Sequence, residues 1–419
     1  MPSAQGRPPD EKRSPVVWFV NQYAGSPHHG MEFRHYELGR QLVELGARVV
    51  VISGSYSHLF AHQPIVRATY QLEEIDGLTY CWVRVPRYAR AISVGRVLSM
   101  VVFMLRLFRL PTRRLPAPDA IVVSSPSLFP ILPARLWARG ADRRLVFEVR
   151  DVWPLTLQEL GGLSRLHPLV AVMGWFERFA YRVADTVVSV FPAAAAHYLA
   201  KGMAPEKLRV VPNGASPDAF LEPSRAAPEQ VRAVADSGAF TVGFVGTLAT
   251  ANAIENLIEA ARLLADDDGI RFVIVGRGSE NDRLRTLAAG QRNLTFLGPV
   301  DKPDVPATLR AFDLCYIGYH RSPLYRFGIS SNKVFDYMAA SRPIVLAADA
   351  ANDWVQASGC GITVAPDDPT ALAAAIRTIR DMSPAERNRL GANGRAFVER
   401  EHAYAVLARR YLPIITGEG

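Results

Sequence analysis

The sequence is poor in cysteine and has no residue spacing typical of a metal site. Its three cysteines, Cys81, Cys315 and Cys360, lie far apart among 419 residues and form no CxxC pair. Isolated cysteines argue against a disulfide framework or a zinc site and favour a reducing compartment. HExxH and comparable ligand spacings are also missing, so we expect neither a metal ion nor a cofactor.

A hydrophobic leader is missing as well. Residues 1–14 are polar and charged, with no apolar run that could form the core of a secretory signal. We therefore predict a disordered tail over residues 1–14 and a cytoplasmic protein.

Glycine-rich nucleotide fingerprints are incomplete. No Walker A sequence occurs, and the apolar run Val16–Val20 is followed by Asn-Gln-Tyr rather than by glycines. Gly276-Arg277-Gly278 resembles the start of a dinucleotide fingerprint, but Asn281 stands where its third glycine would be. These departures disfavour an NAD enzyme. Gly276 and Gly278 still allow close backbone approach, and Arg277 could reach a phosphate, although an ordinary strand-to-helix turn explains the same residues.

Acidic residues are absent between Asp76 and Asp119, an interval that holds eight arginines. Residues 1–222 carry 26 Lys and Arg against 18 Asp and Glu, whereas residues 223–419 carry 22 of each. The positive excess of the whole chain therefore comes from its first half.

Within this basic interval, Ala91–Leu110 is a long apolar segment interrupted by arginines. Each arginine costs about 2.5–3.5 kcal/mol at the centre of a bilayer, which disfavours a spanning helix. We instead predict a basic amphipathic helix on the anionic inner face of the cell membrane, because such surfaces attract arginine. The predicted membrane patch is Arg96, Arg106, Arg109 and Arg113, with Leu98, Val101, Leu105 and Phe108 on the opposite side.

The alternative is a helix that packs on its own domain with solvated arginines. A nucleic-acid partner is disfavoured, since the patch has few aromatic residues and the chain has no nucleic-acid-binding module.

Length and pattern together predict an α/β protein of two domains. A chain of 419 residues exceeds one ordinary domain. In both halves, short apolar runs alternate with helical segments, which is typical of parallel sheets covered on both faces. We predict two doubly wound domains facing across a cleft, with ligands at the carboxyl ends of the strands. The predicted parts are a first domain over 15–222, a linker over 223–238 and a second domain over 239–400, with 401–419 returning to the first.

The most informative segment is Phe327–Pro343, which reads FGISSNKVFDYMAASRP and follows the predicted strand Asp313–Tyr319. A helix is expected to begin at Ser330, Ser331 or Asn332, because serine and asparagine cap helix N-termini. The free amides at such a terminus attract an anion.

Two side chains strengthen this prediction. Lys333 places a cation in the first helical turn, where the helix dipole disfavours it unless an anion is bound. Asp336, one turn later, could accept hydrogen bonds from ribose hydroxyls. Together they predict a nucleotide diphosphate site. A capped amphipathic helix with a solvent-facing lysine is the alternative.

Other candidate residues follow predicted strands. Arg150 and Asp151 lie in Glu148–Pro154 (EVRDVWP), at the end of a buried run, where ionisable groups are costly unless paired or used. The loop Asn21–Gly30 contributes His29, although a loop histidine is more often a surface residue than a catalyst. We predict that Asp151 orients or deprotonates an acceptor hydroxyl, with a histidine of this loop assisting it.

Further candidates are Arg34, on the helix after this loop, and Gly246-Thr247, after the first strand of the second domain. Glycine at position 246 can expose backbone amides to a ligand, or can simply form a turn.

These segments resemble family-4 glycosyltransferases of the GT-B fold, and more closely the bacterial surface-polysaccharide subgroup that transfers N-acetylfucosamine-type sugars. The resemblance covers about residues 16–398. The residues that carry it are EVRDVWP at Glu148–Pro154, VPNG at Val211–Gly214, FVGT at Phe244–Thr247, and GISSNKVFDYM at Gly328–Met338 with Ala339–Pro343.

The resemblance implies two Rossmann-like domains and a last helix that crosses back to the first. The second domain would hold a nucleotide-sugar, most commonly a UDP-sugar, which is a substrate rather than a cofactor. The first domain would hold a lipid-linked saccharide acceptor, with Arg34 and Arg150 on the acceptor side. Transfer would retain the anomeric configuration without a metal. The donor-binding residues implied in this way are Gly30, Gly246, Thr247, Arg277, Gly328, Ile329, Ser330, Ser331, Asn332 and Asp336.

The chain also departs from the family pattern. Asp336 would be the second acid of the Glu-x7-Glu motif, but the first acid falls at Gly328, and the usual histidine before the aspartate falls at Arg150. Thr247 stands where a basic residue is customary. The diphosphate would then depend on Lys333, Arg277 and helix-end amides. Lys333, Asp151 and His29 are the predicted catalytic residues.

Two alternatives remain open at this point. A nucleotide-sugar 2-epimerase of the same architecture would need no acceptor. A non-catalytic, membrane-bound scaffold would explain why position 328 lacks the acid of the family motif and why Arg150 replaces the usual histidine.

Overall fold

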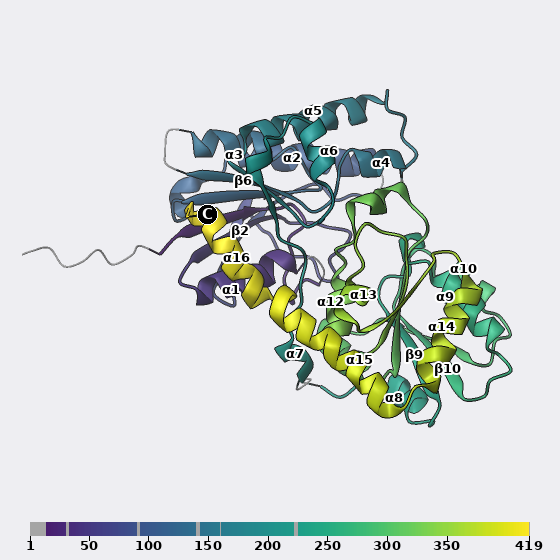
Figure 1. Ribbon diagram of the computed structural model, residues 1–419. Coiled ribbons are helices and arrows are strands. Elements are labelled where there is room, and N and C mark those ends of the chain that lie inside the picture. Colours follow the sequence, from purple (N-terminus) through teal and green to yellow (C-terminus); the bar gives the residue numbers. More distant parts are fainter. Residues whose placement is uncertain are drawn as a thin grey trace, which may run out of the picture. The chain divides into compact units, whose positions relative to one another are not determined.

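The computed structural model describes residues 14–30, 33–89, 93–139, 143–159, 161–221 and 225–418. The tail predicted over residues 1–14 lies outside this set except for Ser14. The described chain is an α/β protein with two sheets (Figure 1).

The first sheet has eight strands in the order β3-β4-β2-β1-β5-β6-β7-β8. Its strands are β1 (Val16–Val20), β2 (Arg48–Gly54), β3 (Tyr70–Ile75), β4 (Leu78–Val83), β5 (Ala120–Ser124), β6 (Arg144–Val149), β7 (Thr186–Ser189) and β8 (Leu208–Val210). The central β1 is buried along its whole length, between the parallel strands β2 and β5. Continuous apolar runs form such strands because helices cover both faces of a parallel sheet.

The hairpin β3–β4 at the edge of this sheet was not predicted. Its strands run antiparallel, and Ile75 pairs with Leu78 across the two-residue turn Asp76-Gly77. Both turn residues have positive φ, 49° and 82°. An Asp-Gly pair between apolar alternations is a strong local signal for this hairpin turn, so the sequence contained the information.

The second sheet has six parallel strands in the order β11-β10-β9-β12-β13-β14. They are β9 (Phe240–Val245), β10 (Ile270–Val275), β11 (Leu294–Leu297), β12 (Leu314–Gly318), β13 (Ile344–Ala347) and β14 (Gly361–Val364). Alternate residues of a strand face opposite sides. Accordingly, Val245 and Val275 join one hydrophobic cluster, and Phe244 and Ile274 join the other.

Helices connect the strands of both sheets, as the alternating pattern predicted. Before β9 they are α1 (Arg34–Glu44), α2 (Val94–Leu107), α3 (Ile131–Ala138), α4 (Leu155–Glu159), α5 (Pro168–Val183), α6 (Ala195–Ala200), α7 (Asp218–Leu221) and α8 (Glu229–Ala235). Later in the chain they are α9 (Ile254–Leu263), α10 (Asn281–Leu287), α11 (Val305–Arg310), α12 (Asn332–Ala339), α13 (Trp354–Ser358), α14 (Pro369–Asp381), α15 (Pro384–Phe397) and α16 (Tyr404–Thr416).

By its internal contacts the chain divides into two compact units. The first unit consists of the chain up to Glu148, the segment Val183–Thr186 and the C-terminal residues from Tyr411 onward. The second unit consists of Val149–Arg182 and Val187–Arg410. The borders predicted for the domains, 15–222 and 239–400, stay a prediction.

The predicted linker over 223–238 is more than an irregular connection. It contains α8, whose Val231 is buried in a hydrophobic cluster with residues of the second sheet. One apolar side chain is too weak a periodic signal to predict such a short helix from sequence.

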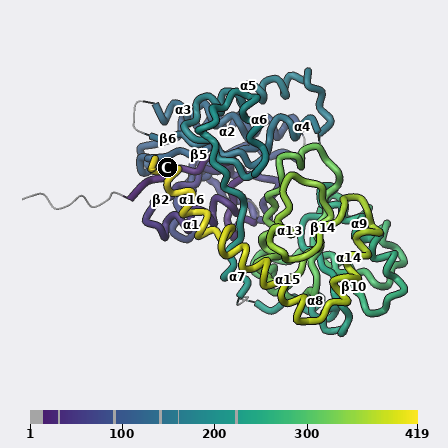
Figure 2. Tube along the Cα trace, viewed as in Figure 1, coloured from purple at the N-terminus to yellow at the C-terminus, as the bar shows by residue number. Residues whose placement is uncertain are grey.

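The final helix returns to the first sheet, as the resemblance implied. The Tyr411 hydroxyl donates to Glu148 Oε1 at 3.4 Å, and the Tyr411 ring lies 6.1 Å from the ring of Phe19. Arg144 donates from Nε to the carbonyl of Ile414 at 3.1 Å. Figure 2 traces this last, yellow part of the chain.

Candidate functional site

The helix predicted to begin between Ser330 and Asn332 is α12. It runs over Asn332–Ala339, and its N-cap is Ser331, whose side chain makes no capping bond. The first turn of a helix leaves backbone amides without intrahelical partners. Among the described residues, Oδ1 of Asn332 is also buried without a hydrogen-bond partner. The N-terminus of α12 therefore keeps polar groups that a ligand could satisfy.

Lys333 points from this first turn to the segment that follows β9. Its Nζ donates to Oδ1 of Asn252 at 2.8 Å and lies 5.8 Å from the centre of the Phe244 ring. Although part of the side chain stays accessible, burial lowers the pKa of Lys333 to about 8, and Asp336 opposes the shift. The ammonium therefore binds a protein acceptor, whereas the alternative reading expected it to face solvent.

The orientation of Asn252 is fixed by its other amide atom. Nδ2 donates to the carbonyl of Thr247 at 2.7 Å, which leaves Oδ1 for the ammonium of Lys333. Asn252 is buried at the end of a short 3-10 turn, Thr250–Asn252. A neutral acceptor thus positions the cation without neutralising its charge.

Gly246 makes room for the lysine. A Cβ at Gly246 would lie 2.6 Å from Cε of Lys333, and a Cβ at Gly276 would lie 1.9 Å from the carbonyl oxygen of Gly246. A Cβ at Gly278 would lie 2.0 Å from the carbonyl oxygen of Leu248. Gly276 and Gly278 thus let the ends of β9 and β10 pack closely. The exposed Arg277 lies between them.

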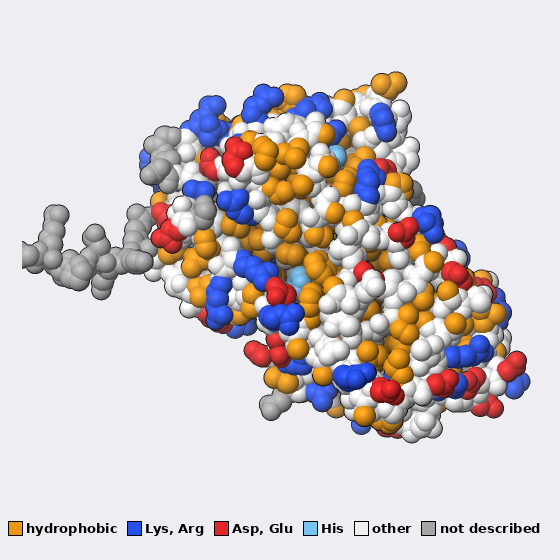
Figure 3. Space-filling model, in the orientation of Figure 1, with side chains coloured by type: hydrophobic (Ala, Val, Ile, Leu, Met, Phe, Trp, Pro, Cys, Tyr) orange, Lys and Arg blue, Asp and Glu red, His pale blue; other side chains and the backbone are white. Residues whose placement is uncertain are grey.

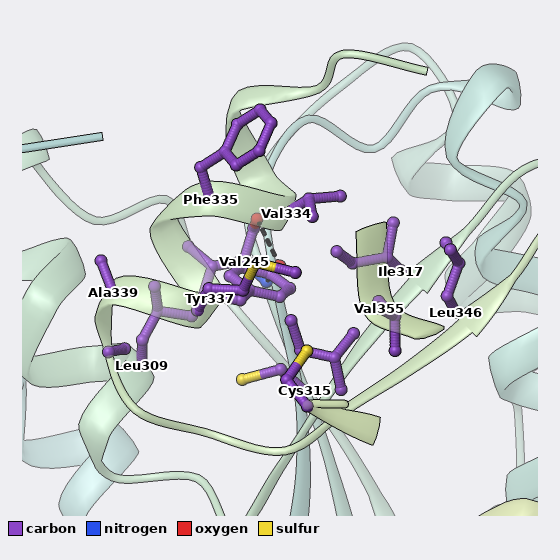
Figure 4. Packing of buried hydrophobic residues seen from close by; sticks show 14 of the residues in the cluster. Val245, Leu309, Cys315, Ile317, Val334, Phe335, Tyr337, Ala339, Leu346 and Val355 are labelled. Atoms are coloured by element: carbon purple, nitrogen blue, oxygen red, sulfur yellow. Dashed lines mark hydrogen bonds between the residues drawn. The ribbon is translucent and has the colours of Figure 1, made fainter. Parts of the chain in front are cut away.

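Helix α12 is tied to the end of β9 by Tyr337. The Tyr337 hydroxyl accepts from the backbone N–H of Val245 at 2.9 Å and lies 3.0 Å from its carbonyl, to which it donates. Figure 4 shows this ring packed among buried side chains of the second sheet. Because Val245 precedes Gly246, the tie holds Lys333 against its partners.

Asp336 lies one turn beyond Lys333. Its Oδ2 is 3.2 Å from Nζ of Lys302, and both side chains are partly exposed. A carboxylate that is accessible and paired with a surface cation can exchange that partner for ligand hydroxyls.

Gly328 has no space for the acid that the family pattern places there. Its φ is +94°, a conformation that favours glycine. A Cβ would lie 2.4 Å from Oδ1 of Asn352 and 2.8 Å from Cδ of Pro192. The departure from the Glu-x7-Glu motif is therefore built into the local packing.

Much of the polar backbone of Ile329 and Ser330 is occupied by protein groups. Asn352 accepts from the Ile329 N–H at 2.6 Å, and both Asn352 Nδ2 and Trp354 Nε1 donate to the Ile329 carbonyl. Asn213 donates its backbone N–H to Oγ of Ser330 at 2.8 Å and its side-chain Nδ2 to the Ser330 carbonyl at 2.5 Å. These bonds hold the loop that leads into α12. That Ile329 or Ser330 binds the nucleotide-sugar donor stays a prediction.

Asp151 lies just after β6 and before α4. Its carboxylate accepts from Oγ1 of Thr156 at 2.7 Å and from Nε1 of Trp153 at 3.0 Å. The neighbouring Arg150 is half-buried. These bonds fix the Asp151 carboxylate, and its catalytic role stays a prediction.

Glu148, three residues earlier, is the centre of a buried polar network. It lies 3.0 Å from Nε of Arg34 and accepts from Oγ of Ser124 at 2.8 Å. His35 Nε2 is 2.8 Å from the same serine oxygen. Arg34 is only 1% exposed. A buried charge of this kind needs its partner, so Arg34 first of all stabilises the end of β6; its acceptor role stays a prediction.

His29 is buried rather than on the surface. Its ring lies 4.7 Å from that of Trp82 and 6.1 Å from that of Phe60, and Nδ1 is 2.9 Å from Oγ of Ser26. Burial lowers the pKa of His29. Gly30 follows with φ +69°, and its N–H donates to the carbonyl of Ser26 at 2.9 Å.

Helix α2 presents apolar side chains on its outer side, and the predicted membrane patch stays a prediction. The buried residues of this helix are Ser99, Met100, Phe103 and Leu107. Its exposed apolar residues are Val94 (86% exposed), Leu98 (56%) and Leu105, and Phe108 follows at the C-cap. The leucines predicted to lie opposite the arginines thus face outward.

The arginines of the predicted patch lie in different surroundings. Arg96 donates from Nε to the Tyr23 hydroxyl at 3.2 Å and packs over its ring, and Nη1 of Arg106 contacts the carbonyl of Arg84. Arg109 and Arg113 are exposed.

Two family matches decide the class of the protein. Residues 239–381 match the family "Glycosyl transferases group 1", and residues 29–214 match the family "Glycosyl transferase 4-like domain". The chain is a glycosyltransferase of the GT-B fold. No curated protein sequence matches this glycosyltransferase.

Solved structures give the same fold at low sequence identity. The glycosyltransferase is similar to a sucrose-phosphate synthase from Thermosynechococcus elongatus, with a TM-score of 0.71 and 17% identity over 96% of this chain and 98% of the other. It is also similar to Anabaena HepE, solved with UDP and glucose, with a TM-score of 0.65 and 16% identity over 96% and 99%. For the trehalose-6-phosphate synthase OtsA the TM-score is 0.72, with 14% identity over 96% and 99%.

Sequence reasoning missed two side chains at the candidate site of the glycosyltransferase. Asn252 contacts Lys333 across 81 positions, and Lys302 contacts Asp336 across 34. Neither stands in a motif or at a regular spacing from the segment it meets. Only the folding of β9 and β12 side by side creates the first contact.

No described helix has both the length and the apolar character needed to cross a bilayer. Among the same residues, no group of three His, Cys, Asp or Glu side chains lies close enough together to hold a metal ion.

Proposed function

We propose that the protein transfers a sugar, an N-acetylated amino or deoxy sugar, from a UDP-sugar to a lipid-linked saccharide with retention of configuration. This reaction would serve the synthesis of a bacterial surface polysaccharide. The family matches support glycosyl transfer. The choice of uridine draws support from structural relatives, since HepE was solved with UDP-glucose and an E. coli relative with UDP-2-fluoro glucose.

One observation carries the proposed donor site. The ammonium of Lys333 is held by Asn252 beside the N-terminus of α12, where backbone amides and the helix dipole also favour an anion. Lys333 keeps its proton at neutral pH, because its pKa of about 8 lies above 7. Asp336 would leave Lys302 and accept from the ribose hydroxyls.

This arrangement suits the departure of a nucleotide diphosphate. Negative charge grows on the leaving phosphate as the glycosidic bond breaks, and preorganised donors stabilise it in the transition state. Lys333 and the α12 amides would serve that role without a metal ion. The Asp151 carboxylate, held by Trp153 and Thr156, would orient or deprotonate the acceptor hydroxyl.

The proposed acceptor is lipid-linked, and the proposed place is the inner face of the membrane. The outward apolar residues of α2, with Arg109 and the 3-10 turn Thr112–Arg114 beyond its end, suit an anionic lipid surface. The outward apolar side chains of α2 would insert among the lipids, and the arginines at the helix end would meet the headgroups.

Calorimetry with UDP tests the donor site. We expect UDP to bind, and Lys333→Ala to weaken its binding about ten- to a hundredfold, the range of a lost charge-assisted hydrogen bond. Arg232→Ala, at an exposed position on α8, is the control. Unchanged affinity in Lys333→Ala would remove this residue from the site.

Product analysis tests the reaction. With a UDP-sugar and membrane extract, a new glycolipid that keeps the donor's anomeric configuration is expected. Epimerised UDP-sugar formed without any acceptor would favour the epimerase instead. Asp151→Asn should lower turnover at least a hundredfold while UDP affinity is unchanged.

A further inference from the structure

Helix α5 has an apolar outer face as well as an apolar inner one. Its inner residues include Val170, Met173 and Phe176, all buried. On the outside, Trp175 is 51% exposed and stacks on the half-buried ring of Phe179, with centroids 5.2 Å apart and planes 9° from parallel.

Two more apolar side chains extend this outer face. Val172 is 48% exposed and lies three positions before Trp175, so that Val172, Trp175 and Phe179 share one side of the helix. Leu166, in the turn before α5, is 91% exposed. Single exposed apolar residues are ordinary, but a contiguous row with stacked aromatic rings marks a contact surface.

Basic residues form one edge of the same face. Arg178 and Arg182 are exposed and lie one turn apart on α5, and Arg165 is exposed beside Leu166. Figure 3 shows basic and hydrophobic side chains next to one another over α5 as Figure 1 labels it.

The outer face of α5 carries no carboxylate. The one acid of the helix, Glu177, is buried and accepts from Nε2 of His197 at 2.8 Å and from the Tyr181 hydroxyl at 3.3 Å. The charge that the outer face presents is therefore purely positive.

We propose that the outer face of α5, formed by Leu166, Val172, Trp175, Phe179, Arg178 and Arg182, is a second membrane-binding surface that lies in the headgroup region of an anionic bilayer. Tryptophan favours the boundary between headgroups and acyl chains, since its ring is apolar and its N–H is polar. The arginine edge matches lipid phosphates in charge, and arginine stems cover apolar surface while their heads reach the phosphates.

This surface differs from α2 in residues and in chemistry. Helix α2 presents aliphatic side chains, and its own Arg96 and Arg106 are half-buried. Helix α5 instead presents stacked rings with exposed arginines along its length. Only the biological role of this surface, which is to bring the enzyme to a lipid-linked acceptor, rests on the proposed function. The surface is tested with neither donor nor acceptor present.

Cosedimentation of the full chain with vesicles tests the surface. Phosphatidylglycerol-containing vesicles should bind the wild type, and phosphatidylcholine vesicles should bind it much less. We expect at least about a tenfold loss of binding for Arg178→Gln/Arg182→Gln, since each removed arginine contributes about a fivefold factor near an anionic surface. We expect a loss of at least the same size for Trp175→Ser/Phe179→Ser, which removes both stacked rings.

Matched controls stand on other helices of the protein. Leu263→Ser removes an equally exposed apolar residue at the end of α9, and Arg232→Gln/Arg389→Gln removes the same charge from α8 and α15. These variants should bind vesicles as the wild type does. If they lose as much binding as the α5 variants, attraction is diffuse and the proposal fails.

Fluorescence quenching reports the contact directly and does not depend on affinity. Lipids brominated near the headgroup should quench part of the tryptophan emission, and Trp175→Phe, which keeps an apolar ring, should remove that quenched part. If Trp175→Phe leaves the quenching unchanged, Trp175 does not touch lipid and the proposal is overturned.

Self-association is the competing use of an aromatic and basic face. Light scattering should show the same mass for the wild type and for Trp175→Ser/Phe179→Ser. A dimer that these substitutions dissociate would assign the face to a second copy of the chain and overturn the proposal. Sugar transfer to a water-soluble acceptor analogue should survive in every α5 variant, so failure of this surface and failure of the proposed function are distinguishable.

Discussion

The ammonium of Lys333 lies 2.8 Å from the side-chain oxygen of Asn252, although 81 positions separate the two residues. This contact joins the first turn of α12 to the turn after β9. The hydrogen bond fixes the position of the Lys333 ammonium beside the N-terminus of α12. Because asparagine is neutral, the bond does not cancel the positive charge. A diphosphate would supply the missing negative charge.

The pKa of Lys333 makes UDP affinity depend on pH. Burial lowers this pKa to about 8, so the ammonium is charged below that value and is lost above it. We expect UDP affinity to fall about tenfold per pH unit above about 8. Calorimetry over about pH 7–9.5 measures this, and Lys333→Met should give weak binding that does not change over the same range.

The same shift affects folding stability with the opposite sign. The folded-state pKa lies below the ordinary value of 10.5, so the unfolded chain holds more protons between the two values. Without UDP, Lys333 therefore adds stability as the pH rises through 8 towards 10.5. Denaturant unfolding of the wild type, compared with Lys333→Met, isolates this contribution.

Asn252→Ala should weaken UDP binding about five- to tenfold. Without the Oδ1 acceptor the lysine loses its fixed position but keeps its charge. The loss should therefore be smaller than that for Lys333→Ala and close to that of an ordinary hydrogen bond. Asn393→Ala is the matched control, because Asn393 also uses its amide to bond a backbone carbonyl, that of Gly359. Equal affinities for both variants in calorimetry would show that Asn252 does not position the cation.

Gly328→Glu should not restore a family carboxylate but should destabilise the protein by about 1–3 kcal/mol. The new side chain would need φ near +94° and would meet Asn352 and Pro192 at its first carbon. Chemical denaturation measures the cost, and Gly328→Ala should share most of it because both carry a Cβ. A fully stable and more active Gly328→Glu would contradict the packing argument.

Ser341→Gly should stabilise the protein by up to about 1 kcal/mol. Ser341 follows the end of α12 with φ 56°, a left-handed conformation in which a side chain is unfavourable, and its N–H donates to the carbonyl of Met338 at 3.0 Å. The urea midpoint should rise for Ser341→Gly and not for Ser341→Ala, which keeps the Cβ. Equal midpoints for the two variants would refute the strain argument.

Local signals predicted most of the secondary structure. The apolar run Val16–Val20 forms β1 with the same bounds. The helix that was expected to begin at Ser330, Ser331 or Asn332 begins at Asn332. Both signals depend on neighbours in sequence, an unbroken apolar run and a polar N-cap. The hairpin turn Asp76-Gly77 was equally local and was overlooked.

The sequence by itself determined the alternation of strands and helices, the first-turn position of Lys333 and the basic character of the chain before residue 223. These properties follow from residue order alone, because periodicity, capping and charge are local. Only the tertiary structure decided that Lys333 meets Asn252, that Gly328 leaves no room for an acid, and that the leucines of α2 face outward. The physical reason is that such contacts depend on which strands lie side by side and which helix face finds a core, and both depend on packing between distant segments.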